Sequence, residues 1–162
     1  MGRLVLPTSG SVYVDTPPVI YSADNHPVYG SVCAPLWQPT GFDVISSELT
    51  LLEILVDPLR NGNLAIAARR EALWSQNHTH LMLITQSISR EAAQLRADIP
   101  GLKTPDAIHA ATALYHGCAL FVTNDKGLQR IPNLPLVLLD DVLAAPQSPN
   151  HPTTQSPNDP AT

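Results

Sequence analysis

The stretch TPDAIHAATALYHGCALFVTND, residues 104–125, has the pattern of a helix followed directly by a strand. Thr104 is expected to cap the helix, with Pro105 at its first position and Gly117 after its end. The run ALFVT (119–123) is almost continuously apolar, which is typical of a strand buried on both faces of a parallel sheet. Because the helix runs one way and the strand returns, both ends of the stretch are expected at the same edge of the sheet.

Further strand and helix patterns alternate on either side of this stretch. Strands are predicted at residues 11–15, 41–46, 81–85, 119–123 and 134–140. Helices are predicted at residues 47–59, 63–76 and 89–97, besides the one above and one begun by Thr16 and Pro17, with Ser47 and Ser89 as caps and Pro58 as an exit signal. Such alternation predicts a three-layer α/β domain with about five parallel strands and right-handed crossovers. In open sheets of this kind, ligands bind beyond the carboxyl ends of the strands.

Length and composition are those of one globular domain with a polar tail. The chain has 162 residues, of which 44% are apolar, enough for one hydrophobic core. Residues 146–162 (PQSPNHPTTQSPNDPAT) are rich in Pro, Ser, Thr and Asn and are predicted to be disordered, so the domain is expected to span residues 1–145. A formal charge of −5 without a basic stripe argues against tight non-specific binding to nucleic acid. It does not exclude an enzyme that touches nucleic acid through a few residues and a metal.

Cysteine usage and hydropathy predict a cytoplasmic protein. Cys33 and Cys118 are far apart and outside any CxxC motif, which argues against a disulfide or a zinc site and favours a reducing compartment. No apolar run approaches the 18 residues of a membrane span. We therefore expect a cytoplasmic location and no membrane partner.

Three aspartates are predicted to meet at the carboxyl edge of the sheet. Asp15 ends the first predicted strand, and Asp125 lies two residues past the fourth. Asp106 lies near the start of the helix that leads into that fourth strand, where the helix dipole favours an anion. Taken singly, Asp106 is explained as a first-turn acid and Asp125 as a turn former. Their shared edge is the feature that suggests a site.

The second predicted helix adds a fourth acid. Leu49, Leu52 and Val56 form an apolar stripe on this helix, and Glu53 falls on the same face. A carboxylate held against a core is costly unless it is paired or binds a metal. Glu48 lies in the first turn and is explained as a solvated acid that the helix dipole favours. We therefore favour Glu53 over Glu48 as a site residue.

Four carboxylates at close range, those of Asp15, Glu53, Asp106 and Asp125, would repel one another and raise their pKa values. A divalent cation removes that conflict, and oxygen-only ligands suit Mg²⁺ or Mn²⁺. Hard metals in acidic clusters commonly serve phosphoryl transfer or phosphodiester hydrolysis, in which the metal activates water and neutralises charge at phosphorus. Neighbouring hydroxyl and amide groups could support such a site, although capping and turn formation explain them equally well: Thr16, Thr123 and Asn124.

Four segments resemble the PIN domain, in particular the VapC-type toxins of bacterial toxin–antitoxin pairs. They are VYVDTPPVIYSAD (12–24), SSELTLLEILVDPLRNG (46–62), GLKTPDAIHAATALYHGCALFVTNDKGLQRI (101–131) and LPLVLLDD (134–141). The resemblance covers roughly residues 11–143, and the third segment is its most specific part. It implies a five-stranded parallel sheet in the order 3-2-1-4-5 with helices on both faces.

The resemblance also implies a function. It implies a Mg²⁺- or Mn²⁺-dependent ribonuclease, often a homodimer, held inactive by a cognate antitoxin protein. The acidic site of the family matches four residues of this chain, which are thereby implied to be catalytic and to bind the metal: Asp15, Glu53, Asp106 and Asp125. One position departs from the family pattern, because Pro17 stands where an Asn is usual. Substrate handling is therefore expected to differ.

Two other functions are compatible with these patterns. An acidic pocket in a doubly wound domain also describes phospho-acceptor signalling modules, but these need paired acids early in the chain, and no acid precedes Asp15. A PIN-like domain without nuclease activity could serve as a binding module, which the presence of all four acids disfavours. A metal-dependent endoribonuclease that cleaves RNA is the leading prediction.

Overall fold

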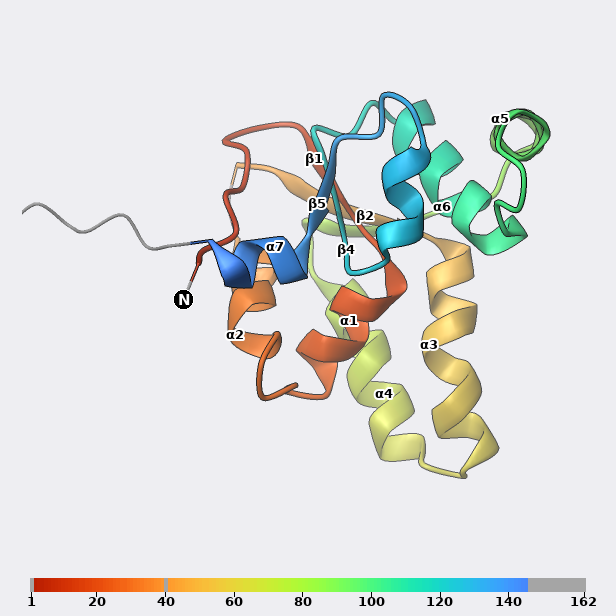
Figure 1. Cartoon of the computed structure of the whole chain (residues 1–162). Helices are drawn as coiled ribbons and strands as arrows, with labels where there is room; N and C mark the ends of the chain where they lie inside the picture. Colours follow the sequence, from red (N-terminus) through yellow and green to blue (C-terminus); the bar gives the residue numbers. More distant parts are fainter. Residues whose placement is uncertain (1, 40, 146–162) are drawn as a thin grey trace, which may run out of the picture.

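The computed structural model describes residues 2–39 and 41–145 and shows one parallel sheet of five strands in the order β3-β2-β1-β4-β5 (Figure 1). The strands are β1 (Ser11–Val14), β2 (Asp43–Ser47), β3 (Thr79–Met82), β4 (Leu120–Thr123) and β5 (Leu136–Leu138). The helices are α1 (Thr16–Ala23), α2 (Gly30–Cys33), α3 (Glu48–Arg60), α4 (Leu64–Ala72), α5 (Gln86–Asp98), α6 (Thr104–Tyr115) and α7 (Leu139–Ala144), with short 3-10 turns η1 (Ala34–Trp37), η2 (Leu73–Ser75) and η3 (Lys126–Arg130). The predicted fold class and strand order are confirmed, while the predicted tail at 146–162 lies outside the described residues. Within the described ranges, no helix has the length and apolar character needed to cross a membrane.

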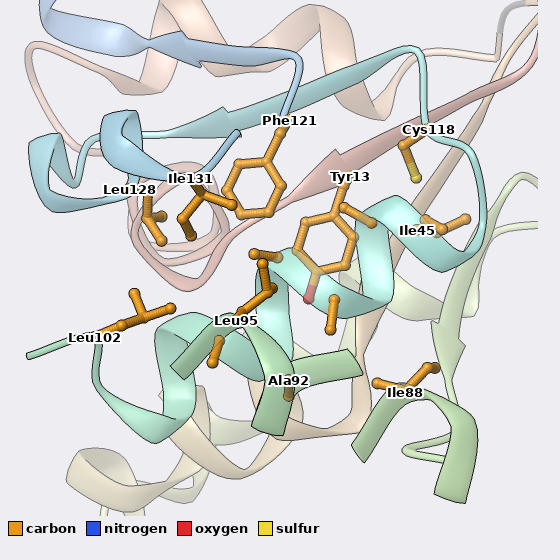
Figure 2. Packing of buried hydrophobic residues seen from close by; sticks show 14 residues of the cluster. Tyr13, Ile45, Ile88, Ala92, Leu95, Leu102, Cys118, Phe121, Leu128 and Ile131 are labelled. Atoms are coloured by element: carbon orange, nitrogen blue, oxygen red, sulfur yellow. The ribbon is translucent and has the colours of Figure 1, made fainter. Parts of the chain in front are cut away.

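Side chains alternate between the two faces of the sheet, and helices cover both faces (Figure 1). On β1, Tyr13 joins one hydrophobic cluster, whereas Val12 and Val14 join the other. The first cluster is completed by residues of α5 and α6, and the second by residues of α1, α2, α3 and α7. Figure 2 shows the first cluster, in which the stacked rings of Tyr13 and Phe121 have centroids 4.8 Å apart. Burial on both faces explains the continuous apolar runs of the central strands.

The central strand β1 determines where the chain leaves the sheet. Tyr13 is in register with Ile45 of β2 on one side and with Phe121 of β4 on the other. One residue past β1, the Asp15 amide donates to the Val122 carbonyl of β4 at 3.0 Å. Asp15 and the residues that follow β4 therefore lie at the same edge of the sheet.

The third strand begins two residues earlier and ends three residues earlier than predicted. β3 begins at Thr79, and Leu83 and Ile84, which the apolar pattern assigned to the strand, are 65% and 36% exposed beyond its end. Thr85 instead caps α5, where its hydroxyl accepts from the Ile88 amide at 3.3 Å. The predicted cap Ser89 therefore lies inside the helix. Because β3 is an edge strand, its apolar neighbours are not forced into a core, and the helix cap decides the boundary.

The fifth strand is shorter than its apolar run, which was predicted as a strand over 134–140. β5 covers Leu136–Leu138, and α7 follows at once. The Asp140 amide, in the first turn of α7, donates to the side-chain oxygen of Asn124 at 3.1 Å. This bond satisfies one of the amides that a helix start leaves unpaired, and it favours a helix over a longer strand. α1 and α6 each begin one residue earlier than predicted.

A proline inside α3 is accommodated by a buried arginine. α3 runs through Pro58, past the predicted exit, to Arg60. Because proline has no amide hydrogen, the Ile54 carbonyl lacks its helical donor. The Arg70 guanidinium, from α4, donates to that carbonyl at 2.7 Å and also pairs with Asp24 at the end of α1. Arg70 therefore joins three helices at one point.

Candidate active site

A cavity of about 400 Å³ opens at the carboxyl edge of the sheet, between α1, α3, α6 and the turn after β4. Its lining includes all four acids predicted from the sequence and one histidine: Asp15, Glu53, Asp106, Asp125 and His109. A larger hollow of about 850 Å³ lies between residues 3–8 and the α2–η1 segment, and the charged residue of its lining is Arg3. The smaller cavity is the candidate site, because it gathers groups that can act on a substrate.

Asp15 is buried at the end of β1, and both of its carboxylate oxygens are engaged. Oδ1 accepts from the Thr16 amide at 2.8 Å, which makes Asp15 the N-cap of α1, and Oδ2 accepts from the Thr123 hydroxyl at 2.6 Å. Thr123 ends β4, so the pairing of β1 with β4 brings this hydroxyl to the carboxylate. The same hydroxyl accepts from the Asp125 amide at 3.0 Å. One threonine therefore orients Asp15 and the turn that carries the fourth acid.

Glu53 reaches the cavity from α3 and is held there by two donors. Its Oε2 accepts from the Thr16 hydroxyl and lies 3.0 Å from His109 Nε2. Burial acts to raise the pKa of Glu53, but the hydrogen bonds from His109 and Thr16 outweigh that effect, so the pKa lies below its usual value. The carboxylate therefore stays ionised at neutral pH. Glu48, in the first turn of α3, is exposed and does not line the cavity.

The apolar stripe that was used to select Glu53 is not a buried face. Leu52 and Val56 are 59% and 40% exposed, and both line the cavity. The buried positions of α3 are three other residues: Thr50, Ile54 and Pro58. The expectation that the stripe packs into the core was wrong. Glu53 lines the cavity because this side of α3 faces the carboxyl edge of the sheet.

Asp106 and Asp125 add negative charge from α6 and from the turn after β4. Burial raises the pKa of Asp106, and the charges of Asp125 and Asp15 raise it further, against the opposing charge of Lys103. Asp125 is exposed, and its Oδ1 accepts from the Gly127 amide at 2.7 Å. Asp106 therefore lies close enough to Asp125 and Asp15 for their charges to act on it.

His109 is a residue of the cavity that the sequence patterns did not single out, because a histidine inside a helix is usually explained by packing or by exposure at the surface. It is 3% exposed, and its Nε2 lies 3.0 Å from Glu53 Oε2 and 3.7 Å from Asp15 Oδ1. Burial acts to lower the pKa of His109, but the hydrogen bond to Glu53 and the charge of Asp15 outweigh it, so the pKa lies above its usual value. The available signal was spacing, since His109 follows Asp106 by three positions and shares its face of α6.

Of the three polar residues predicted to support the acids, two contact them. The hydroxyls of Thr16 and Thr123 donate to Glu53 and Asp15, respectively. Asn124 does not line the cavity, because its side-chain oxygen accepts from the Asp140 amide and ties the turn after β4 to α7. Pro17, the position that departs from the family pattern, lies in the first turn of α1 and lines the cavity.

The donor chemistry of the cavity fits a divalent cation, although the side chains as placed do not encircle one. Among residues 2–39 and 41–145, no three His, Cys, Asp or Glu side chains are grouped closely enough to hold an ion. The four predicted carboxylates nevertheless line one cavity, where burial raises the pKa of Asp106 and the charges of Asp125 and Asp15 raise it further. In the described part of the chain, no hydrogen bond to the Asp106 carboxylate is seen, so both of its oxygens can turn toward a cation. Oxygen donors of this kind suit Mg²⁺ or Mn²⁺.

Comparison with known proteins identifies a family and supports the fold. The family model described as PIN domain matches residues 12–134. One similar structure is that of VapBC2 from Rickettsia felis bound to a DNA fragment from the VapBC2 promoter. Its TM-score is 0.65 at 16% identity, and the match covers 79% of this chain and 98% of that chain. A toxin–antitoxin complex from Klebsiella pneumoniae has a TM-score of 0.59 at 23% identity, with 79% and 97% covered. VapC20 from Mycobacterium tuberculosis, described as a sarcin–ricin loop cleaving toxin, has a TM-score of 0.60 at 18% identity, with 73% and 92% covered. No curated protein matches the sequence.

Proposed function

This chain belongs to the PIN domain family, and from that premise we propose that it is a metal-dependent endoribonuclease, the toxin of a type II toxin–antitoxin pair. One observation carries the proposal: four carboxylates from four separate segments line a single cavity at the carboxyl edge of the sheet, together with a fifth, that of Asp57, which is paired with Arg60. A structural role alone gives no reason to gather charges that repel one another, whereas a site for cations beside a phosphate requires them. The proposed catalytic and metal-binding residues are Asp15, Glu53, Asp106 and Asp125.

The structural neighbours support the proposed substrate and partner classes. One neighbour is a toxin–antitoxin complex, and VapC20 is described as a toxin that cleaves the sarcin–ricin loop. By this likeness we propose RNA as the substrate and a cognate antitoxin protein as the partner that holds the enzyme inactive. We further propose a homodimer in the cytoplasm, with the nuclease domain in residues 1–145.

The residues of the cavity have separate roles in the proposed reaction. Hydrolysis breaks one P–O bond of the RNA backbone; the hydroxyl of a water stays on phosphorus, and the departing ribose oxygen takes up a proton. When bound, Mg²⁺ or Mn²⁺ supplies positive charge against the phosphate and makes a neighbouring water more acidic. Asp15, held by Thr16 and Thr123, would provide a rigid ligand. Asp106 could turn toward the ion, and Asp125, whose Oδ1 is held by the Gly127 amide, would offer its other oxygen. Glu53 stays ionised beside His109 and would complete the ligand set.

We expect the purified full-length protein to cleave RNA with Mg²⁺ or Mn²⁺, to lose this activity in excess EDTA, and to regain it when Mn²⁺ is added back. The metal is needed because the four carboxylates alone repel a phosphate. Gel analysis of a structured RNA measures the cleavage, and expression of the toxin without its partner should arrest growth. Absence of both effects would support the inactive binding module instead. Labelling of Asp15 by acetyl phosphate would support the signalling module.

The two glutamates of α3 provide a matched pair for testing the site. We expect Glu53→Gln to lower the rate of metal-dependent RNA cleavage about a hundredfold, the equivalent of about 2.7 kcal/mol in activation free energy. Glu48→Gln should leave the rate unchanged, because Glu48 is exposed and outside the cavity. Initial rates at a fixed Mn²⁺ concentration measure both. Loss of activity in Glu48→Gln together with full activity in Glu53→Gln would show that the glutamate assignment is wrong.

A further inference from the structure

A chain of buried hydrogen bonds connects the core of the sheet to the cavity. The Ser47 amide donates to the Tyr13 hydroxyl oxygen at 3.1 Å, and that hydroxyl lies 2.7 Å from His109 Nδ1. His109 Nε2 lies 3.0 Å from Glu53 Oε2. Tyr13 is fully buried, and its ring stacks on Phe121 with an angle of 12° between the planes (Figure 2). The tyrosine is therefore a fixed support for the histidine ring.

The direction of these bonds determines which nitrogen of His109 faces Glu53 as a donor. Tyr13 is fully buried and its oxygen accepts from the Ser47 amide, so its own hydrogen needs an acceptor, and His109 Nδ1 lies within reach of it. With Nδ1 as an acceptor, the neutral imidazole carries its hydrogen on Nε2, and the imidazolium carries a hydrogen there as well. That N–H points to Glu53 Oε2, and Asp15 Oδ1 lies 3.7 Å from the same nitrogen.

We propose that His109 is a positioning residue of the divalent-ion site: its Nε2–H holds the Glu53 carboxylate beside Asp15, and Tyr13 fixes the ring that does so. The proposal deepens the proposed function and rests on it, since it assigns a role within the same cavity. Glu53 comes from α3 and Asp15 from the end of β1, and both approach the same nitrogen. Without that donor the two negative charges repel each other, and Glu53 keeps the Thr16 hydroxyl as its described donor.

A packing role is the alternative, and the partners of the ring argue against it. Both ring nitrogens have polar partners, the hydroxyl of the buried Tyr13 on one side and the acids of the cavity on the other. Residues that hold metal ligands in place are usually bonded in this way, and their loss typically weakens metal binding about 10- to 100-fold. A packing residue would instead affect the stability of the fold and leave metal affinity unchanged.

The test measures Mn²⁺ affinity of the full chain by isothermal titration calorimetry in three variants. We expect His109→Leu to weaken Mn²⁺ binding about 10- to 100-fold. His109→Gln should stay near the wild-type affinity, because the glutamine amide can donate to Glu53 in place of Nε2. Tyr13→Phe keeps the ring but loses the bond to Nδ1, and its affinity should fall between those of the other two. Thr112→Val, a buried change three residues further along α6, is the matched control and should bind as wild type does.

A second readout separates positioning from packing. If His109 only positions ligands, the Mn²⁺ concentration for half-maximal RNA cleavage should rise in His109→Leu, while the rate at saturating Mn²⁺ stays near that of wild type. The inference is overturned if folded His109→Leu binds Mn²⁺ within about twofold of wild type, or if His109→Gln is as weak as His109→Leu. If circular dichroism shows that the leucine variant is unfolded, Tyr13→Phe decides instead. An affinity of folded Tyr13→Phe for Mn²⁺ within about twofold of wild type would then overturn the inference. A wild-type chain that neither binds Mn²⁺ nor cleaves RNA would overturn the proposed function itself, whereas an active wild type with unaffected variants overturns only this inference.

Discussion

Replacing Asp106 by Asn is expected to slow metal-dependent RNA cleavage about a thousandfold, the equivalent of about 4 kcal/mol in activation free energy. The effect should be large because the Asp106 carboxylate lines the same cavity as Asp125 and Asp15, feels the charges of both, and has both oxygens available to a cation. Asparagine keeps the size of the side chain but removes its charge. Single-turnover cleavage rates at several Mn²⁺ concentrations measure the loss. Asp43→Asn is the control and should keep the wild-type rate. Asp43 is an exposed acid at the start of β2, the end of the strand away from the cavity.

The same substitution should not weaken the fold. The pKa of Asp106 is raised by burial and by the neighbouring acids. At a pH between its values in the unfolded and the folded state, the folded protein therefore still holds a proton that the unfolded chain has released. Ionisation of Asp106 therefore lowers the stability as pH rises above the ordinary carboxyl range, and Asp106→Asn removes that loss. We expect a midpoint of thermal unfolding equal to or above that of wild type at pH 7. A variant that keeps more than about a tenth of the wild-type rate would contradict the role assigned to this acid.

Replacing Arg70 by Met is expected to lower the free energy of unfolding by about 3 kcal/mol, which corresponds to a fall of roughly 6–12 °C in the unfolding midpoint. The variant leaves the Ile54 carbonyl and the Asp24 carboxylate without the guanidinium that now binds both. Urea titration followed by circular dichroism measures the change. Arg69→Met is the matched control, because Arg69 is half-exposed and lies 3.6 Å from Asp24, and it should cost well under 1 kcal/mol.

The Arg70 prediction also has a pH dependence. The hydrogen bond from Arg70 holds the pKa of Asp24 below its usual value. A depressed carboxyl pKa contributes stability that is present at neutral pH and is lost as pH falls through the folded-state pKa. The difference in stability between wild type and Arg70→Met should therefore narrow in acid. A difference that is constant from pH 7 down to pH 3 would indicate that the Ile54 carbonyl, and not the ion pair, accounts for the effect.

The fold was predictable because its central strands are buried on both faces. The runs that became β1 and β4 are nearly all apolar, and Asp15 and Asp125 mark the ends of these segments. Boundaries were less predictable, since they depend on neighbours that the local pattern does not contain. Thr85 follows an apolar run and looks like strand, yet its hydroxyl caps α5. Asp140 likewise begins a helix because Asn124, sixteen positions earlier, accepts from its amide.

Three acids of the candidate site, Asp15, Asp106 and Asp125, were predicted from their position near strand ends or a helix start, and Glu53 from its face of a helix, but their environment was not predictable. Glu53 was selected on the assumption that its face is buried, and that face is open to the cavity. His109 could not be distinguished from a core histidine, because its partners Tyr13 and Glu53 come from distant segments. Such roles depend on side chains that meet only after folding. A three-residue spacing from a candidate acid is the signal to examine in similar sequences.

The position of β1 between β2 and β4 has a consequence for protein synthesis. Asp15 is made early, but its partner Thr123 and the turn that carries Asp125 are made only when 125 of the 162 residues have been joined. At about 5–20 residues per second, the ribosome needs roughly 6–22 s to travel from the first of these acids to the last. A polypeptide released within that interval lacks Asp125 and cannot assemble the complete proposed catalytic centre. If the chain has the proposed nuclease activity, we therefore expect its prematurely terminated translation products to lack that activity.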